Sequence, residues 1–148
     1  MPHIQLADGL NMHYEVLGAA DHPPIVTVHG WLGTPNRDLG KVNDWLSQYF
    51  RVYSPTLRGY GQSRPPQRDF PSGFYERDAD DVVAFMDALG IEQAQLVGYS
   101  DGGESALIAA GKHTHRFGRV FVWGAVGYFG NQMIPFAKRL LEDPFLKK

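Results

Sequence analysis

The segment around Ser100 has the residue types and the spacing of a nucleophilic serine on a sharp turn. Gly98 and Gly102 flank it in the pattern Gly-x-Ser-x-Gly, after an apolar stretch typical of a strand and before a helical pattern. A serine on such a turn adopts a strained backbone, and side chains two residues away would collide with it. Glycine at both flanking positions removes that collision. The segment therefore predicts a serine that attacks a carbonyl carbon.

A second glycine-rich segment, residues 29–33, could supply the hydrogen-bond donors that this reaction needs. It directly follows an apolar run, where a loop can direct a backbone N–H at a developing oxyanion. We expect the two donors to be the backbone N–H groups of Trp31 and Asp101. Gly30 is interpreted as a structural residue, and His29 as a structural histidine rather than the catalytic base. The Trp31 side chain is either a pocket wall or part of the core.

These motifs resemble the α/β-hydrolase superfamily. The pair H-G-W-L-G and G-Y-S-D-G-G carries the resemblance, together with the R-G-Y-G-Q-S stretch between them. More narrowly, R-G-Y-G-Q-S-R-P-P-Q-R-D-F, F-Y-E-R-D-A and G-Y-S-D-G-G-E-S-A-L-I-A-A are similar to the valacyclovir hydrolase (biphenyl hydrolase-like) branch. The resemblance implies a Ser-His-Asp mechanism on small esters or amides, with no cofactor. In that branch the acidic residue after the nucleophile is associated with a substrate amino group, and Asp101 matches it.

The sequence departs from the superfamily in two places. Thr56 stands where a structural aspartate is usual, which affects local stability more than chemistry. The pattern also stops after the sixth strand, so the resemblance covers only the N-terminal part. None of the six histidines is well placed to act as the base: His3, His13, His22, His29, His113 and His115. We therefore expect the chain as given to lack the triad histidine and acid and to be inactive alone.

Two functions remain open. The first is a serine esterase-type hydrolase that acts through an acyl-enzyme, with small, amino-bearing esters as one candidate substrate class. The alternative is a non-catalytic hydrolase-like protein that binds a ligand or a partner. The role of Asp101 is open in the same way, because a carboxylate near an oxyanion is tolerable only if it is paired. Its counterion is either a substrate ammonium or a protein cation such as Arg58.

The expected elements alternate between strands and helices. They are a hairpin over 4–16, strands over 25–28, 51–53, 94–99 and 119–123, and helices over 39–49, 72–89 and 101–113. Ser72 could cap the second helix, and Gly90 is suited to end it. The order predicts an α/β-hydrolase fold, a mostly parallel sheet with helices on both faces, truncated after the sixth strand. Residues 1–125 would form the N-terminal part of the core, and 126–148 the incomplete start of a lid region.

Three side-chain clusters are interpreted as structural. Asp78, Asp80 and Asp81 are expected on a solvated helix face rather than at a metal site. Arg58, Arg64 and Arg68 lie in one loop and are expected to be surface or structural residues. The run Phe121–Trp123 and the helical pattern Leu39, Val42, Trp45, Leu46 and Tyr49 are expected to face the core.

Composition excludes several other functions. The chain of 148 residues has a net charge of −2 and no cysteine, so disulfides and thiolate metal sites are excluded. The charge gives no reason to expect nucleic acid or a membrane as a partner. The N-terminus lacks the features of a signal peptide, which favours a cytoplasmic location. We expect a small-molecule substrate, and self-association through the exposed edge of a truncated sheet.

Overall fold

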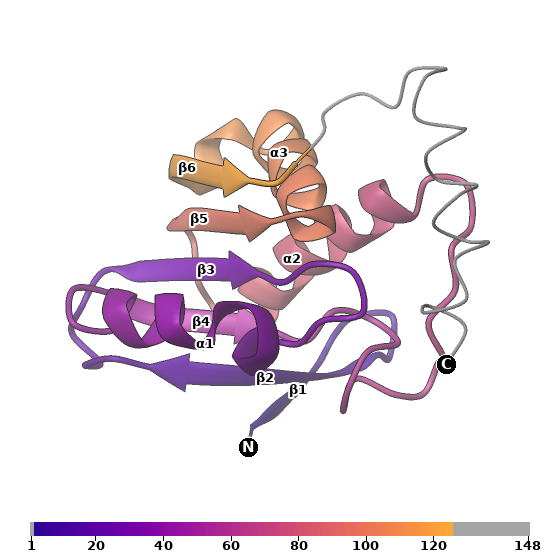
Figure 1. The fold of residues 1–148 in the computed structure, drawn as a ribbon, viewed down its shortest axis with the longest axis horizontal. Helices are drawn as coiled ribbons and strands as arrows, with labels where there is room; N and C mark the ends of the chain where they lie inside the picture. The colour runs from indigo at the N-terminus through magenta and orange to yellow at the C-terminus, as the bar shows by residue number, and fades with distance from the viewer. Residues whose placement is uncertain (1, 126–148) are drawn as a thin grey trace.

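Six strands form one sheet in the order β1-β2-β4-β3-β5-β6 (Figure 1). The computed structural model describes residues 2–125. The strands are β1 (His3–Gln5), β2 (Asn11–Leu17), β3 (Pro24–Val28), β4 (Arg51–Pro55), β5 (Ala94–Tyr99) and β6 (Phe117–Trp123). β3 runs parallel to β4 and β5, and β6 is parallel to β5, whereas β2 pairs antiparallel with β1 and β4. The predicted mostly parallel sheet with an N-terminal hairpin is confirmed.

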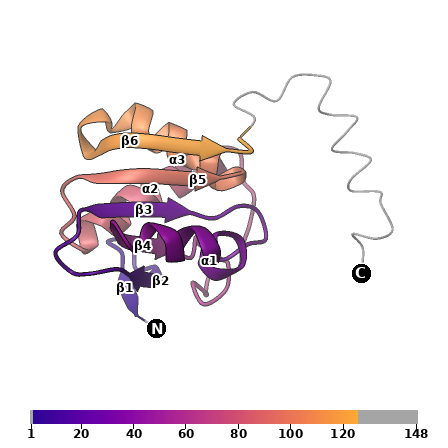
Figure 2. The same cartoon turned by 60° about the vertical axis from the view of Figure 1, so that its left-hand side comes forward.

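Helices cover both faces of the sheet, as predicted (Figures 1 and 2). α1 (Pro35–Leu46) packs on β2, β3 and β4, whereas α3 (Asp101–Lys112) packs on β3, β5 and β6 of the other face and lies beside α2 (Phe74–Ala88). A short 3₁₀ turn, Thr114–Arg116, leads into β6. The small residues Ala106 and Ala109 are fully buried, which lets α3 lie close to the sheet.

The central strands are apolar on both sides because each side meets a different cluster. Val26, Val28 and Leu96 pack with α2 and α3, while Ile25 and Val97 pack with the α1 side. A parallel strand buried on both faces has a continuous apolar run rather than an alternating one. This is the pattern that the sequence shows at β3.

The start of α2 differs from the prediction. Ser72 does not cap this helix. Gly73 is the N-cap residue and has φ +81°, a left-handed conformation that side chains rarely adopt. The end of the helix is as predicted, because Gly90 follows it with φ +68°.

Three aromatic residues expected in the core are exposed instead. Trp45 and Tyr49 are 58% and 55% exposed, because α1 buries Leu39 and Leu46 and ends before Tyr49. Phe121 is 64% exposed because β6 lies at the edge of the described sheet with no helix over that side. The core prediction for these three side chains is therefore wrong.

Among residues 2–125 no helix is long and apolar enough to cross a membrane. The lid region predicted for residues 126–148 lies outside the described part of the chain.

Candidate active site

Ser100 occupies a strained turn between β5 and α3. Its φ and ψ are +54° and −124°, outside the conformations that a non-glycine residue usually adopts. A Cβ on Gly98 would lie 2.5 Å from the carbonyl oxygen of Gly102. A Cβ on Gly102 would overlap the carbonyl oxygens of Val28 and His29. The backbone therefore requires glycine at both positions, which explains the spacing seen in the sequence.

Backbone hydrogen bonds on both sides hold this turn in place. The N–H of Ser100 donates to the carbonyl of Trp123 over 3.0 Å, which ties the turn to β6. Its carbonyl accepts from Gly103 at 2.8 Å and from Glu104 at 3.2 Å, in the first turn of α3. The serine thus sits at the positive end of a helix dipole, where negative charge is stabilised.

The loop 29–33 lies directly against Ser100. A Cβ on Gly30 would be 3.1 Å from the Cβ of Ser100. The N–H of Gly30 donates to Oδ2 of Asp38 over 3.0 Å, and Gly33 lies so close to the same carboxylate that a Cβ there would overlap it. Asp38, in the first turn of α1, therefore fixes this loop, a role that the sequence interpretation missed.

His29 is fully buried and both of its ring nitrogens are engaged. The backbone N–H of Leu57 donates to Nε2 over 3.0 Å. Nε2 is therefore the acceptor, and Nδ1 donates to the carbonyl of Gly30 over 2.8 Å. Burial lowers the pKa of His29 to about 4, which keeps the ring neutral. The ring joins the end of β3 to the chain after β4 and has no nitrogen left to accept a proton from Ser100.

The other five histidines all lie in the described part of the chain and away from Ser100. His3 and His13 belong to the hairpin at the opposite edge of the sheet. His22 lies before the N-terminal end of β3, whereas the loop that packs on Ser100 follows the C-terminal end of this strand. The remaining two follow the far end of α3. That helix has 12 residues, or about 18 Å at about 1.5 Å per residue.

His13 instead forms a structural network with Thr56. Its Nδ1 is 2.9 Å from Thr56 Oγ1, and its carbonyl accepts from the Thr56 N–H at 2.8 Å. The Ser63 hydroxyl donates to the Thr56 carbonyl over 2.6 Å. The threonine that replaces the usual aspartate is thus buried and fully hydrogen-bonded.

Asp101, the first residue of α3, has a phenol as its nearest polar partner. The Tyr75 hydroxyl donates to Oδ1 of Asp101 over 3.0 Å. Burial raises the pKa of Asp101, and the Tyr75 hydrogen bond and the charge of Arg68 offset part of that rise. Arg58 is not its counterion, because two of its nitrogens donate to Asp81 at 2.8 and 2.6 Å. Arg58 is therefore excluded as the partner of Asp101, and the protein cation whose charge acts on this carboxylate is Arg68.

Arg68 lies in an aromatic cage beside this pair. Its guanidinium donates to both oxygens of Asp78, each over 2.7 Å. The rings of Tyr60, Phe70 and Phe74 surround it at 4.7, 5.0 and 5.4 Å from their centroids. This buried ion pair fastens the long loop to α2.

The acidic cluster on α2 is therefore only partly solvated. Asp78 and Asp81 are 1% and 5% exposed and pair with arginines of the loop that folds over this helix. Only Asp80 is on an exposed face, where it pairs with Lys112. The prediction of a solvated face is therefore wrong for Asp78 and Asp81. Within residues 2–125 no three His, Cys, Asp or Glu side chains are grouped so that they could hold a metal ion.

Trp31 follows Gly30 in the loop that packs against Ser100, and its side chain lies at the surface. It is 51% exposed, so the core alternative for this side chain is wrong. Its ring meets Phe70 edge-on at 6.5 Å, and Phe70 meets Phe74 at 5.3 Å. Together these rings form an aromatic row from the loop 29–33 to the start of α2.

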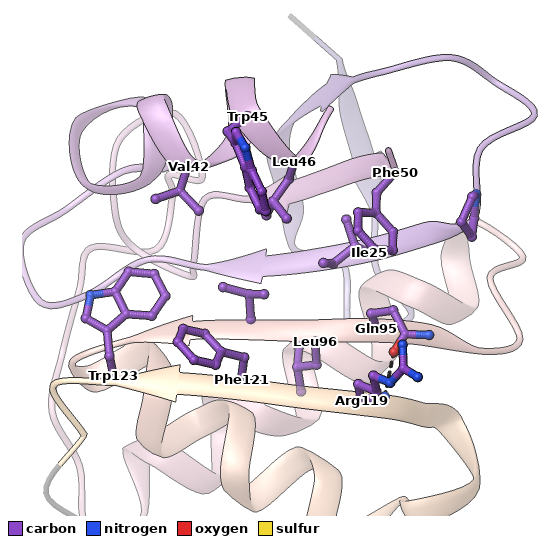
Figure 3. A pocket seen from close by; sticks show the side chains of 12 residues that line it. Ile25, Val42, Trp45, Leu46, Phe50, Gln95, Leu96, Arg119, Phe121 and Trp123 are labelled. Carbon is purple, nitrogen blue, oxygen red and sulfur yellow. Dashed lines mark hydrogen bonds between the residues drawn. The ribbon is translucent and has the colours of Figure 1, made fainter. Parts of the chain in front are cut away.

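A large groove among the described residues lies elsewhere, on the α1 face of the sheet (Figure 3). It has a volume of about 850 Å³ and is lined mainly by apolar side chains, among them Val42, Trp45, Leu46, Phe121 and Trp123. Ser100 does not line it. The groove is therefore distinct from the candidate site around Ser100.

The comparisons with known proteins agree with this geometry. The family model described as alpha/beta hydrolase fold matches residues 23–143. The chain therefore belongs to the α/β hydrolase fold family.

Two relatives show which members of this family the chain resembles. Human serine hydrolase BPHL is 42% identical over 122 residues, which are 82% of this chain and 42% of that protein. The 2-hydroxymuconate semialdehyde hydrolase of Pseudomonas putida is 35% identical, over 70% of this chain and 37% of its own length. The predicted resemblance to the biphenyl hydrolase-like branch is confirmed. The chain spans less than half the length of these relatives.

A solved structure shows the same fold. The 2-hydroxy-6-oxo-6-phenylhexa-2,4-dienoate hydrolase (BphD) from Rhodococcus sp. strain RHA1 superposes with a TM-score of 0.76 at 27% identity. The match covers 88% of this chain and 48% of that chain.

Proposed function

We propose that this protein is a serine hydrolase that cleaves small carboxylic esters or amides through an acyl-enzyme. The observation that carries the proposal is the strained Ser100 at the N-terminus of α3, with the loop 29–33 packed against it. The family membership and the identity to a serine hydrolase support the same chemistry.

The proposed reaction begins with attack of Ser100 Oγ on the substrate carbonyl. The resulting oxyanion accepts hydrogen bonds from the backbone N–H groups of Trp31 and Asp101, each worth about 3 kcal/mol in reactions of this type. A histidine takes the serine proton and passes it to the leaving group, and water then cleaves the acyl-enzyme. Because all six histidines are accounted for elsewhere in the fold, we propose that this histidine is supplied from outside these 148 residues.

The side chain of Asp101 favours substrates that carry an amino group. A carboxylate beside the oxyanion site opposes the charge that develops there, and a substrate ammonium would offset it. Arg58, the protein cation considered as an alternative, pairs with Asp81, and Arg68 donates its hydrogen bonds to both oxygens of Asp78. We therefore propose amino-bearing esters, such as amino-acid esters, as the preferred class.

Ester hydrolysis with and without Ser100 tests the proposal. The 148-residue chain should hydrolyse p-nitrophenyl esters no faster than its Ser100→Ala variant, because it lacks a base. A fusion of the same chain to the C-terminal part of a full-length relative should show a burst of p-nitrophenol that Ser100→Ala abolishes. If the fusion folds and shows no Ser100-dependent burst, the non-catalytic binding protein becomes the better account.

A further inference from the structure

The carboxylate of Asp101 is held from one side only. Oδ1 accepts the Tyr75 hydroxyl at 3.0 Å, and among residues 2–125 no hydrogen bond to Oδ2 is found. The two residues come from different helices, since Tyr75 lies in the first turn of α2 and Asp101 begins α3. Their contact therefore joins the first turn of α2 to the first residue of α3, directly after Ser100.

The structure also holds Tyr75 in place. Its ring packs against Phe74 at a tilt of 37°, with the centroids 4.0 Å apart, and Arg68 fixes the same turn of α2 through Asp78. Burial and the neighbouring Asp101 raise the pKa of Tyr75, so that the hydroxyl keeps its proton and remains a donor at neutral pH.

We propose that Tyr75 is a positioning residue of the proposed hydrolase, and that its hydroxyl holds Oδ1 of Asp101 so that Oδ2 faces the ammonium group of the substrate. This inference rests on the proposed function and deepens it. A carboxylate whose rotation is fixed by one donor loses less conformational freedom when it binds a second donor.

The charged groups around Asp101 set the expected pH dependence. Arg68 lowers its pKa, whereas Glu104 of α3 raises it. Asp78 of α2 and Tyr60 also interact electrostatically with Asp101. Loss of the Tyr75 hydroxyl removes a donor to the charged carboxylate and leaves these other groups in place, so the pKa of Asp101 should rise further.

A Tyr75→Phe variant of the 148-residue chain tests this with two readouts that need no turnover. Carbon NMR titration follows the Asp101 carboxyl, and NMR binding isotherms compare valinamide with its uncharged deamino analogue, 3-methylbutanamide. We expect the pKa of Asp101 to rise by about one unit. The affinity for valinamide at pH 6.5 should fall about tenfold, with no change for 3-methylbutanamide. On acidification, the variant should lose valinamide binding at a higher pH than the wild type.

Two further variants keep the result interpretable. Tyr49→Phe removes the hydroxyl of an exposed tyrosine that follows α1 and should change neither readout. In an Asp101→Asn background, Tyr75→Phe should no longer affect valinamide binding. An unchanged Asp101 pKa, or an equal loss of affinity for both amides, would overturn the proposal. Failure of the proposed function would appear separately, as absence of Ser100-dependent chemistry in a fusion that still binds valinamide through Asp101.

Discussion

His29 illustrates how a residue next to a catalytic motif can serve the fold alone. Its ring is neutral in the folded protein, where burial lowers its pKa to about 4 from 6.5. The unfolded chain takes up a proton near pH 6.5, well before the folded chain does. Its neutral, hydrogen-bonded ring thus contributes stability above pH 6.5 that is lost as the pH falls toward 4.

We predict that lowering the pH from 6.5 to about 4 decreases the unfolding free energy, measured in urea, more in the wild type than in a His29→Gln variant. The expected difference is about 3 kcal/mol. The slope of the unfolding free energy against pH is compared, and not its value at one pH, because the substitution also removes two hydrogen bonds. His115→Gln, at an exposed position after α3, is the matched control. Parallel pH profiles for wild type and His29→Gln would contradict the account.

Asp101 should determine substrate preference in a catalytically complete form of the protein. Asp101→Asn should lower kcat/KM for amino-acid esters by about ten- to a hundredfold, because a charge-assisted contact is lost. Neutral esters of the same size should be almost unaffected. Paired kinetics on the two ester classes are the measurement, and an equal loss on both would mean that Asp101 only supports the turn at Ser100.

The roles of some of these residues could be predicted from local spacing, whereas the roles of others depend on tertiary contacts. The turn at Ser100 could be predicted because its glycines satisfy a local steric requirement. The roles of Asp38 and Tyr75 and the partner of Arg68 were missed, because each contact joins a loop or helix to a different element. No spacing pattern marks such contacts in a single chain.

The loop between β4 and α2 depends on the buried pair of Arg68 and Asp78. Their side chains are 7% and 1% exposed. Removing one partner leaves a buried charge unpaired, so Arg68→Ala should cost about 3–5 kcal/mol of unfolding free energy. The pair Arg77–Asp69 is the control, because its aspartate is 62% exposed, and Asp69→Ala should leave the unfolding free energy almost unchanged. Similar losses from both substitutions, measured by urea unfolding, would mean that burial of the pair is unimportant.

The same loop explains where element prediction succeeded and failed. Apolar runs and glycine positions were enough to predict β3, β5 and the end of α2, since these signals are local. The burial of Asp78 and Asp81 was not predictable, because it depends on a glycine- and arginine-rich loop that folds back over the helix. The chain enters α2 through left-handed Gly73, and the serine-cap prediction did not anticipate that geometry.

β6 is the last strand of the described sheet, and its side chains Phe121 and Trp123 line the groove beside it (Figure 3). Val120 and Phe121 are exposed on this edge strand, and unpaired strand edges promote association. We predict that the 148-residue chain self-associates through β6, with a sedimentation coefficient that rises with concentration. Phe121→Lys should reduce this association, whereas Leu107→Lys, on an exposed part of α3, should not. A stable monomer at high concentration would refute the prediction.

The central claim is that Ser100 is a nucleophile placed by this fold and activated by a base from outside these residues. Intact-mass and peptide mass spectrometry after reaction with a fluorophosphonate test it directly, because only an activated serine reacts rapidly. The 148-residue chain and its fusion to the C-terminal part of a full-length relative are compared over time. The account predicts a single modification at Ser100 in the fusion, about 10²–10⁴-fold faster than in the chain alone. Equal rates in the two proteins, or modification at a different residue, would contradict it.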